Sequence, residues 1–314
     1  APGVMAGNVA LLKHAPNVPQ CAERIASLFH EAGFEKGVFQ NLFLSNEQAA
    51  QVIEDERVRA VTLTGSVGAG KAVGSTAGGA IKPIVLELGG SDAFIVLNDA
   101  DLDAAVETAI KSRTQNNGQS CIAAKRFIVP RSIAPRFEER MVERMRAKKV
   151  GDPLDEETEV GPQARSDLRD DLHEQVTKSV EKGARLLLGG EVPDGPGAFY
   201  PPTVLTDVGP GMPAYEEELF GPVAAIIPVG GEEEAIRTAN DTVFGLGAAV
   251  FTRDLAKGEE IAARRLDAGN CFVNAFVKSD PRLPFGGVKE SGYGRELAAY
   301  GIREFVNVKT VYVA

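Results

Sequence analysis

The first 80 residues alternate short apolar runs with segments whose apolar positions recur at helical spacing. After Pro19, apolar residues at 21, 25, 28 and 29 follow the helical period, and Ala32-Gly33 ends the pattern. The pattern predicts strands over 8–13, 37–44 and 60–64, and helices after Pro19, over 47–55 and over 68–78. Strands that alternate with helices indicate a parallel sheet with helices on its faces.

A second α/β alternation begins near Glu87. Its predicted helices cover 101–110, 133–149, 166–182, 232–240 and 254–266, and its predicted strands cover 126–130, 185–188, 223–227, 247–251 and 271–274. We therefore expect an α/β protein with a first domain over 1–86, a second domain over 87–289, and a return helix with a terminal strand over 290–314.

Both ends of the chain carry information. The chain opens almost directly on the strand over 8–13, which suggests a fragment with a truncated Rossmann-type first domain. At the other end, residues 306–313 alternate cleanly between apolar and polar positions and predict a strand with one buried face. Such a terminal strand can complete a neighbour's sheet, so we expect a homo-oligomer, a dimer or a tetramer.

Composition narrows the classes of function. The 314 residues carry 44 acidic against 34 basic side chains, a net charge of −10, which disfavours nucleic-acid and anionic membrane surfaces. No apolar run is long enough to span a bilayer, and we expect a cytoplasmic protein. The three cysteines and three histidines are dispersed, which argues against a disulfide framework and against a metal site.

A glycine-rich segment resembles a phosphate loop without completing it. Residues 65–71, Gly-Ser-Val-Gly-Ala-Gly-Lys, follow a predicted strand and open a predicted helix. The match to a nucleotide triphosphatase fails at Ala72, where a hydroxyl should hold magnesium. Two readings remain open: a turn whose amides bind a phosphate or pyrophosphate, and a tight turn that needs glycine for packing.

Cys121 is the central candidate for chemistry. It lies at a turn after Gly118, between the predicted helix and the predicted strand, where a thiol can be held in place and still reach a ligand. Glu87 ends an apolar strand and precedes two glycines, a placement that suits a general base acting through water. The alternatives are a small buried hydrophobe for Cys121 and a surface carboxylate for Glu87.

Two further segments combine glycine with polar groups. Residues 217–222, Glu-Glu-Leu-Phe-Gly-Pro, place a carboxylate beside an aromatic ring, which could hold ribose hydroxyls or simply anchor a helix end through Phe220. Residues 284–296, Pro-Phe-Gly-Gly-Val-Lys-Glu-Ser-Gly-Tyr-Gly-Arg-Glu, read as a loop wrapped around a ligand.

Together these motifs resemble the aldehyde dehydrogenase superfamily, in the family's order and over essentially the whole chain. The segments that carry the resemblance are 86–90, 118–121, 218–222 and 284–296. Lys13-His-Ala-Pro16, together with residues 88–92, looks most like the bacterial NAD(P)-dependent succinate-semialdehyde dehydrogenase branch.

The resemblance implies roles for individual residues. Cys121 would attack the aldehyde to give a thiohemiacetal and then a thioester, and Glu87 would activate the hydrolytic water. The cofactor, NAD or NADP, would be held by residues from several motifs, namely Lys13, Gly65, Ser66, Gly89, Glu218 and Phe220. A small aldehyde, succinate semialdehyde, is the expected substrate. By position alone, its carboxylate could meet Arg113, Ser279 or Arg282, although a solvated surface role is the alternative for each.

Two departures from the family pattern matter. Pro16 stands where many NAD-preferring relatives carry a glutamate, and without that carboxylate a 2′-phosphate is tolerated, so NADP becomes plausible. The family's oxyanion-hole asparagine would lie before residue 1, which leaves the backbone amide of Cys121 as the donor. Loss of one such donor costs on the order of a hundredfold to a thousandfold in rate. The alternatives to an active dehydrogenase are therefore a catalytically impaired homologue with a structural role and, less favoured, the nucleotide triphosphatase.

Overall fold

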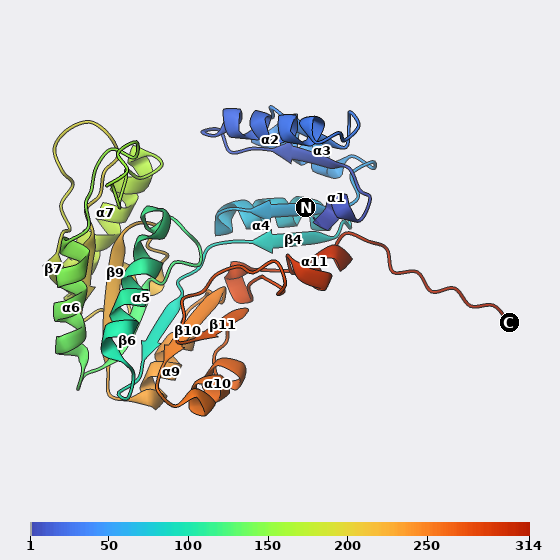
Figure 1. The fold of residues 1–314 in the computed structure, drawn as a ribbon. Helices are drawn as coiled ribbons and strands as arrows, with labels where there is room; N and C mark the ends of the chain where they lie inside the picture. Colours follow the sequence, from blue (N-terminus) through green and yellow to red (C-terminus); the bar gives the residue numbers. More distant parts are fainter. Residues whose placement is uncertain (1) are drawn as a thin grey trace. The chain divides into compact units, whose positions relative to one another are not determined.

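The computed structural model describes residues 2–314, which form two compact units. The first unit extends to Leu88 and also contains Ser279–Gly286 and Gly292–Ala314; the second comprises Gly89–Lys278 and Gly287–Ser291. Figure 1 shows the helices and strands of the two units.

The first unit contains two small sheets. Its elements are α1 (Pro2–Met5), β1 (Ala10–Lys13), α2 (Pro19–Glu31), β2 (Phe39–Leu42), α3 (Asn46–Glu54), β3 (Val61–Thr64), α4 (Val67–Gly79), β4 (Ile84–Glu87), β12 (Gly292–Tyr293) and α11 (Ala298–Arg303). Strands β1 and β2 pair in parallel, as do β3 and β4, and β12 adds to β4 antiparallel. The predicted strand–helix alternation is confirmed here, but it forms two sheets instead of one.

The second unit is built on one seven-stranded sheet. Its elements are β5 (Ala93–Val96), α5 (Leu102–Thr114), η1 (Gln115–Gly118), β6 (Arg126–Pro130), α6 (Ala134–Arg146), α7 (Ser166–Glu181), β7 (Arg185–Leu188), β8 (Thr203–Thr206), α8 (Pro213–Glu216), β9 (Val223–Val229), α9 (Glu232–Asn240), β10 (Gly247–Phe251), α10 (Leu255–Arg264), β11 (Asn270–Val273) and η2 (Lys289–Ser291). The strand order is β11-β10-β5-β6-β9-β8-β7, and only β7 pairs antiparallel.

Both faces of this sheet are buried. Side chains on one face of the strands pack with α5 and α6, through residues such as Phe127 and Phe137, while the other face packs with α7, α9 and α10. Neighbouring residues on a strand point to opposite faces, so Ile95 enters one core while Phe94 stacks on Phe251 in the other, with ring centroids 4.3 Å apart. The α/β fold class is therefore confirmed.

Some sequence-based expectations differ from the structure. Strands β8 and β12 were not expected. Strand β5, an interior strand of the large sheet, was not expected either, because its run is buried on both faces and shows no alternation. The predicted terminal strand over 306–313 is absent from the single chain: its residues pair with no strand, and Val308 and Val313 are 84% and 86% exposed. The alternating pattern therefore has no partner within one copy of the chain.

The phosphate-loop reading of residues 65–71 does not survive. Only Gly65 and Ser66 connect β3 to α4, and the amide of Gly70 is already bonded within the helix, to the carbonyl of Ser66 at 2.9 Å. Gly70 is instead explained by packing, since a Cβ there would lie 2.4 Å from Leu88 Cδ1. Two residues are too few for a loop that wraps a triphosphate.

This explanation predicts opposite effects for two glycines of α4. Gly70→Ala should lower the free energy of unfolding by about 1–2 kcal/mol, because Leu88 must be displaced. Gly78→Ala should raise it by about 0.5 kcal/mol, because no atom lies within 4 Å of the added Cβ and alanine favours helix. Urea unfolding of both variants checks the pair, and a stabilising Gly70→Ala would contradict the packing argument.

Candidate active site

Cys121 is presented by a left-handed turn at the end of α5. Asp101 caps the start of this helix by accepting a hydrogen bond from the Ala104 amide, which confirms the predicted acidic start. After Thr114 the backbone takes φ values of +48°, +57° and +76° at three successive residues, Asn116, Asn117 and Gly118. Asparagine and glycine are the residues that adopt this conformation at least cost.

The turn is held from several sides. Asn117 Oδ1 accepts from the Gly161 amide at 2.7 Å, and Asn117 Nδ2 donates to the Pro162 carbonyl at 3.2 Å. At Gly118, a Cβ would lie 2.2 Å from the carbonyl oxygen of Gly221, so no other residue fits there. Cys121, three residues later, is partly exposed. The thiol is thus reachable while the turn before it is fixed.

A buried cation lies behind this turn. The Lys125 side chain is 0% exposed, and its ammonium donates to the carbonyls of Ser120 at 2.9 Å and Cys121 at 2.8 Å. The same ammonium lies 3.2 Å from Glu218 Oε1, which also accepts from the Gly90 amide at 3.0 Å. Burial lowers the pKa of Lys125, and the neighbouring carboxylate of Glu218 opposes that shift.

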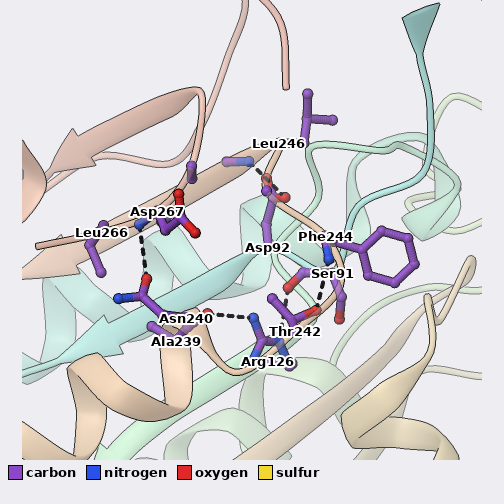
Figure 2. Close-up of a pocket in the computed structure, with 14 residues that line it drawn as sticks. Ser91, Asp92, Arg126, Ala239, Asn240, Thr242, Phe244, Leu246, Leu266 and Asp267 are labelled. Atoms are coloured by element: carbon purple, nitrogen blue, oxygen red, sulfur yellow. Dashed lines mark hydrogen bonds between the residues drawn. The ribbon is translucent and has the colours of Figure 1, made fainter. Parts of the chain in front are cut away.

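A small polar cavity adjoins this cluster (Figure 2). Asp92, buried in its wall, accepts from the Gly247 amide through Oδ1, whereas Oδ2 has no hydrogen-bond partner among the described residues. Arg126 crosses the cavity floor and donates to the carbonyls of Ser91 and Ala239 (Figure 2). Burial raises the pKa of Asp92 to about 6, and the Lys125 charge counteracts this rise.

Glu87, in the first unit, is a carboxylate without hydrogen-bond partners. It ends β4, it is buried, and neither carboxyl oxygen has a partner among residues 2–314. Burial, and secondarily the charge of Glu296, raise its pKa to about 7, while Arg295 acts in the opposite direction. A carboxyl group that titrates near neutrality has the property expected of a general base.

The predicted cofactor residues of the first unit lie at element ends. Lys13 ends β1 and donates to Asn46 Oδ1 at 3.1 Å, at the start of α3. Ser66 caps α4, whose first turn holds no acidic side chain, and the exposed Gly65 precedes it. Such an uncompensated helix N-terminus suits an anionic group, so these residues fit a dinucleotide pyrophosphate.

The predicted cofactor residues of the second unit lie together. A Cβ on the buried Gly89 would lie 2.4 Å from Glu218 Oε2, so glycine is needed for this close approach. Phe220, two residues beyond Glu218, is 38% exposed. A carboxylate and an accessible ring beside one another are compatible with a nicotinamide ribose and ring.

The three residues predicted for the substrate carboxylate fare differently. Arg113 is 0% exposed and donates to the Gly118 carbonyl at 2.6 Å, so in this structure it supports the turn and cannot reach a substrate. Its burial lowers the pKa of the guanidinium to about 9. Neither the expected contact with a substrate nor the alternative surface role fits a fully buried side chain. Ser279 is exposed, and Arg282 pairs with its neighbour Asp280. The structure therefore identifies none of these three residues as a substrate-binding group.

Comparison with known proteins decides the family. Residues 1–311 match the aldehyde dehydrogenase family. The chain belongs to this family. The prediction of an NAD(P)-dependent oxidoreductase with an aldehyde dehydrogenase-like fold is thereby confirmed.

Individual aldehyde dehydrogenases resemble this one closely. The succinate semialdehyde dehydrogenase [NAD(P)+] Sad of Escherichia coli is 55% identical over 311 residues, which are 99% of this chain and 67% of that protein. A probable succinate-semialdehyde dehydrogenase [NADP(+)] of Synechocystis is 53% identical, with 100% and 69% covered. The crystal structure of succinic semialdehyde dehydrogenase from Streptococcus pyogenes with NADP+ superposes with a TM-score of 0.97 at 42% identity, with 100% and 69% covered.

Sequence reasoning missed Lys125 and Asp92 as parts of the site. A signal existed: Lys125 and Arg126 stand directly before the apolar run of β6, and cations in such a run are rarely buried unless paired. The sequence did not show which groups pair with them.

Within residues 2–314, no helix is long and apolar enough to cross a membrane, and no cluster of side chains suited to a metal is present.

The raised pKa of Glu87 predicts a pH-dependent stability difference. The folded pKa, about 7, lies above the ordinary value of 4.5, so between these values the folded state binds more protons than the unfolded state. The wild type should therefore lose stability relative to Glu87→Gln as the pH rises from 5 to 8, by roughly 2–3 kcal/mol.

Urea unfolding of both proteins at pH 5 and pH 8 measures this difference. In a Glu296→Gln background the loss should shrink, because the like charge that helps to raise the pKa is gone. An identical wild-type-to-variant difference at the two pH values would show that the Glu87 pKa is not raised.

Proposed function

We propose that this aldehyde dehydrogenase oxidises succinate semialdehyde to succinate with NAD or NADP, through a covalent intermediate on Cys121. The observation that supports the mechanism is the fixed turn that presents a partly exposed thiol above a buried cation. The choice of substrate is supported by relatives at 53–55% identity that are named as succinate-semialdehyde dehydrogenases.

In the acylation half of the reaction, the Cys121 thiolate attacks the aldehyde carbon. A C–S bond forms, the carbonyl π electrons move to oxygen, and the product is a thiohemiacetal alkoxide. The backbone amide of Cys121 donates to this oxygen. Loss of hydride from the same carbon restores the carbonyl as a thioester. The bound nicotinamide nucleotide supplies the hydride acceptor.

In the deacylation half, Glu87 acts as general base. Its carboxylate takes a proton from water, the water oxygen attacks the thioester, and the C–S bond breaks to return the thiolate and release the acid. A pKa near 7 leaves a large fraction of Glu87 ionised at neutral pH and keeps it basic enough to accept the proton.

For the cofactor, we propose that Lys13, Gly65 and Ser66 hold the adenosine ribose and the pyrophosphate. Gly89, Glu218 and Phe220 would hold the nicotinamide ribose and ring. The open helix N-terminus at Ser66 and the close approach of Gly89 to Glu218 support these assignments.

We further propose a homo-oligomer in which residues 306–313 add to a neighbour's sheet. This segment carries an alternating apolar pattern, and its valines are exposed in the single chain. As an added strand in a neighbour's sheet, this segment would form backbone hydrogen bonds and bury its apolar side chains.

The first experiment measures absorbance at 340 nm with the polypeptide, succinate semialdehyde and either NAD or NADP. Reduction is expected with the wild type and should fall at least a thousandfold in Cys121→Ala, because the nucleophile is lost. Cys21→Ala, which removes an exposed cysteine of α2, is the matched control and should retain wild-type turnover.

Two results would count against the proposal. Turnover that persists in Cys121→Ala would exclude this thiol as nucleophile. Reduction with other aldehydes but not with succinate semialdehyde would retain the mechanism and reject the substrate.

A further inference from the structure

The ammonium group of Lys125 has three oxygen partners beneath the Cys121 turn. It donates to the carbonyls of Ser120 at 2.9 Å and Cys121 at 2.8 Å, and it lies 3.2 Å from the Glu218 carboxylate, with which it forms an ion pair. Its backbone is fixed as well, because the Lys125 amide donates to Asp92 and the Lys125 carbonyl accepts from Ala225. Both ends of this side chain are therefore immobilised.

The two carbonyl contacts fix the direction of two successive peptide groups. In a trans peptide the C=O and the following N–H point in opposite directions, and the described residues contain no cis peptide bond. Because the Ser120 and Cys121 carbonyls both point toward Lys125, the amides of Cys121 and Ile122 point away from it, toward the opposite side of the turn. A hydrogen bond from the Ala123 amide to the Ser120 carbonyl, 3.1 Å long, closes the same turn.

We infer that Lys125 is a positioning residue that aims the Cys121 and Ile122 amides at the developing oxyanion and ties this turn to Glu218. The inference rests on the proposed role of Cys121 as nucleophile. Successive amides that project to one side of a turn form a concavity suited to an anion, which is what a thiohemiacetal oxygen becomes.

The charge of Lys125 adds a second effect. The Cys121 thiol interacts electrostatically with this ammonium, and the other charged groups that act on Lys125 are Glu218, Asp92 and Arg113. A cation close to a thiol favours the thiolate. Lys125 therefore acts in two separable ways, through the position of its donors and through its charge.

Three lysine variants separate these effects. Lys125→Met removes both the charge and the donors while keeping a side chain of similar length. Lys125→Arg keeps the charge but replaces the three donors of the ammonium by a planar guanidinium. Lys149→Met is the control, because it removes a surface lysine of the same unit that pairs with Asp155 and Glu157. For each protein we would measure kcat and KM, and the rate of Cys121 alkylation by iodoacetamide at pH 7. Peptide mass spectrometry resolves this rate from that of Cys21, the exposed internal reference.

The expected pattern is specific. Lys125→Met should slow Cys121 alkylation about tenfold, because loss of the nearby positive charge lowers the fraction of thiolate. It should also lower kcat about ten- to a hundredfold, with a much smaller change in KM for the aldehyde. In Lys125→Arg, the rate of Cys121 alkylation should be within threefold of wild type, yet kcat should remain at least tenfold below wild type. Lys149→Met should match wild type in both measurements.

A purely structural role gives a different result. The inference would be overturned if Lys125→Met folds and its Cys121 alkylation rate and kcat are both within twofold of wild type. A wild-type kcat in Lys125→Arg would also overturn it. The arginine variant decides the question if the methionine variant does not fold. The alkylation rates need no dehydrogenase turnover. An inactive wild type would therefore reject the proposed function, while the charge effect of Lys125 could still be confirmed or overturned.

Discussion

The site in the second unit depends on one buried ammonium group and the three acceptors around it. A charge without exposure is tolerated only when all of its donors are paired, because desolvation of an ion costs several kcal/mol. Lys125 meets this condition with two carbonyls of the Cys121 turn and one carboxylate. The same contacts that stabilise the cation therefore help to fix the orientation of the Cys121 turn and of Glu218. Loss of the cation would remove one partner from each of these three acceptors, of which Ser120 and Glu218 would each keep a backbone amide donor.

The turn itself is encoded locally but completed by distant residues. Asn116, Asn117 and Gly118 supply the positive φ values, which short polar side chains and glycine accept at low cost. The exact approach to Gly221 is a tertiary constraint, since a Cβ at Gly118 would collide with that carbonyl. Gly118 is thus needed so that its backbone can approach that of Gly221, whereas a Cβ at Gly221 would itself lie 2.3 Å from Leu172 Cδ2.

The sequence predicts most elements of this fold, because the helices are amphipathic and most strands are bounded by turn residues. It fails where periodicity carries no signal. Strand β5 is apolar on both faces, so it reads as neither helix nor alternating strand. For the terminal segment the prediction fails for the opposite reason. The alternation of residues 306–313 is clear, but a strand needs a neighbouring strand to pair with, and these residues pair with none in the single chain.

For the site, the motifs point to Cys121, Glu87 and Glu218 but not to their surroundings. Arg113 illustrates the limit. A cation eight positions before the proposed nucleophile is a reasonable candidate for binding an anionic substrate. In the structure, however, the Arg113 side chain points into the core and donates to the Gly118 carbonyl. Whether a charged side chain faces a ligand or the interior depends on the packing of elements that are far apart in the sequence. Sequence position alone could not separate Arg113 from Lys125.

The two proposed functional glutamates show how environment divides one residue type between two tasks. Glu218 meets an ammonium and a backbone amide, and these partners hold one of its oxygens in place while the side chain stays partly accessible. Glu87 is buried with no hydrogen-bond partner, near a second carboxylate, and its pKa rises to about 7. A carboxylate that is held by partners is suited to fixed recognition of hydroxyl groups. A carboxylate whose ionised form is disfavoured is suited to proton transfer, because it gains stability when it accepts a proton from water.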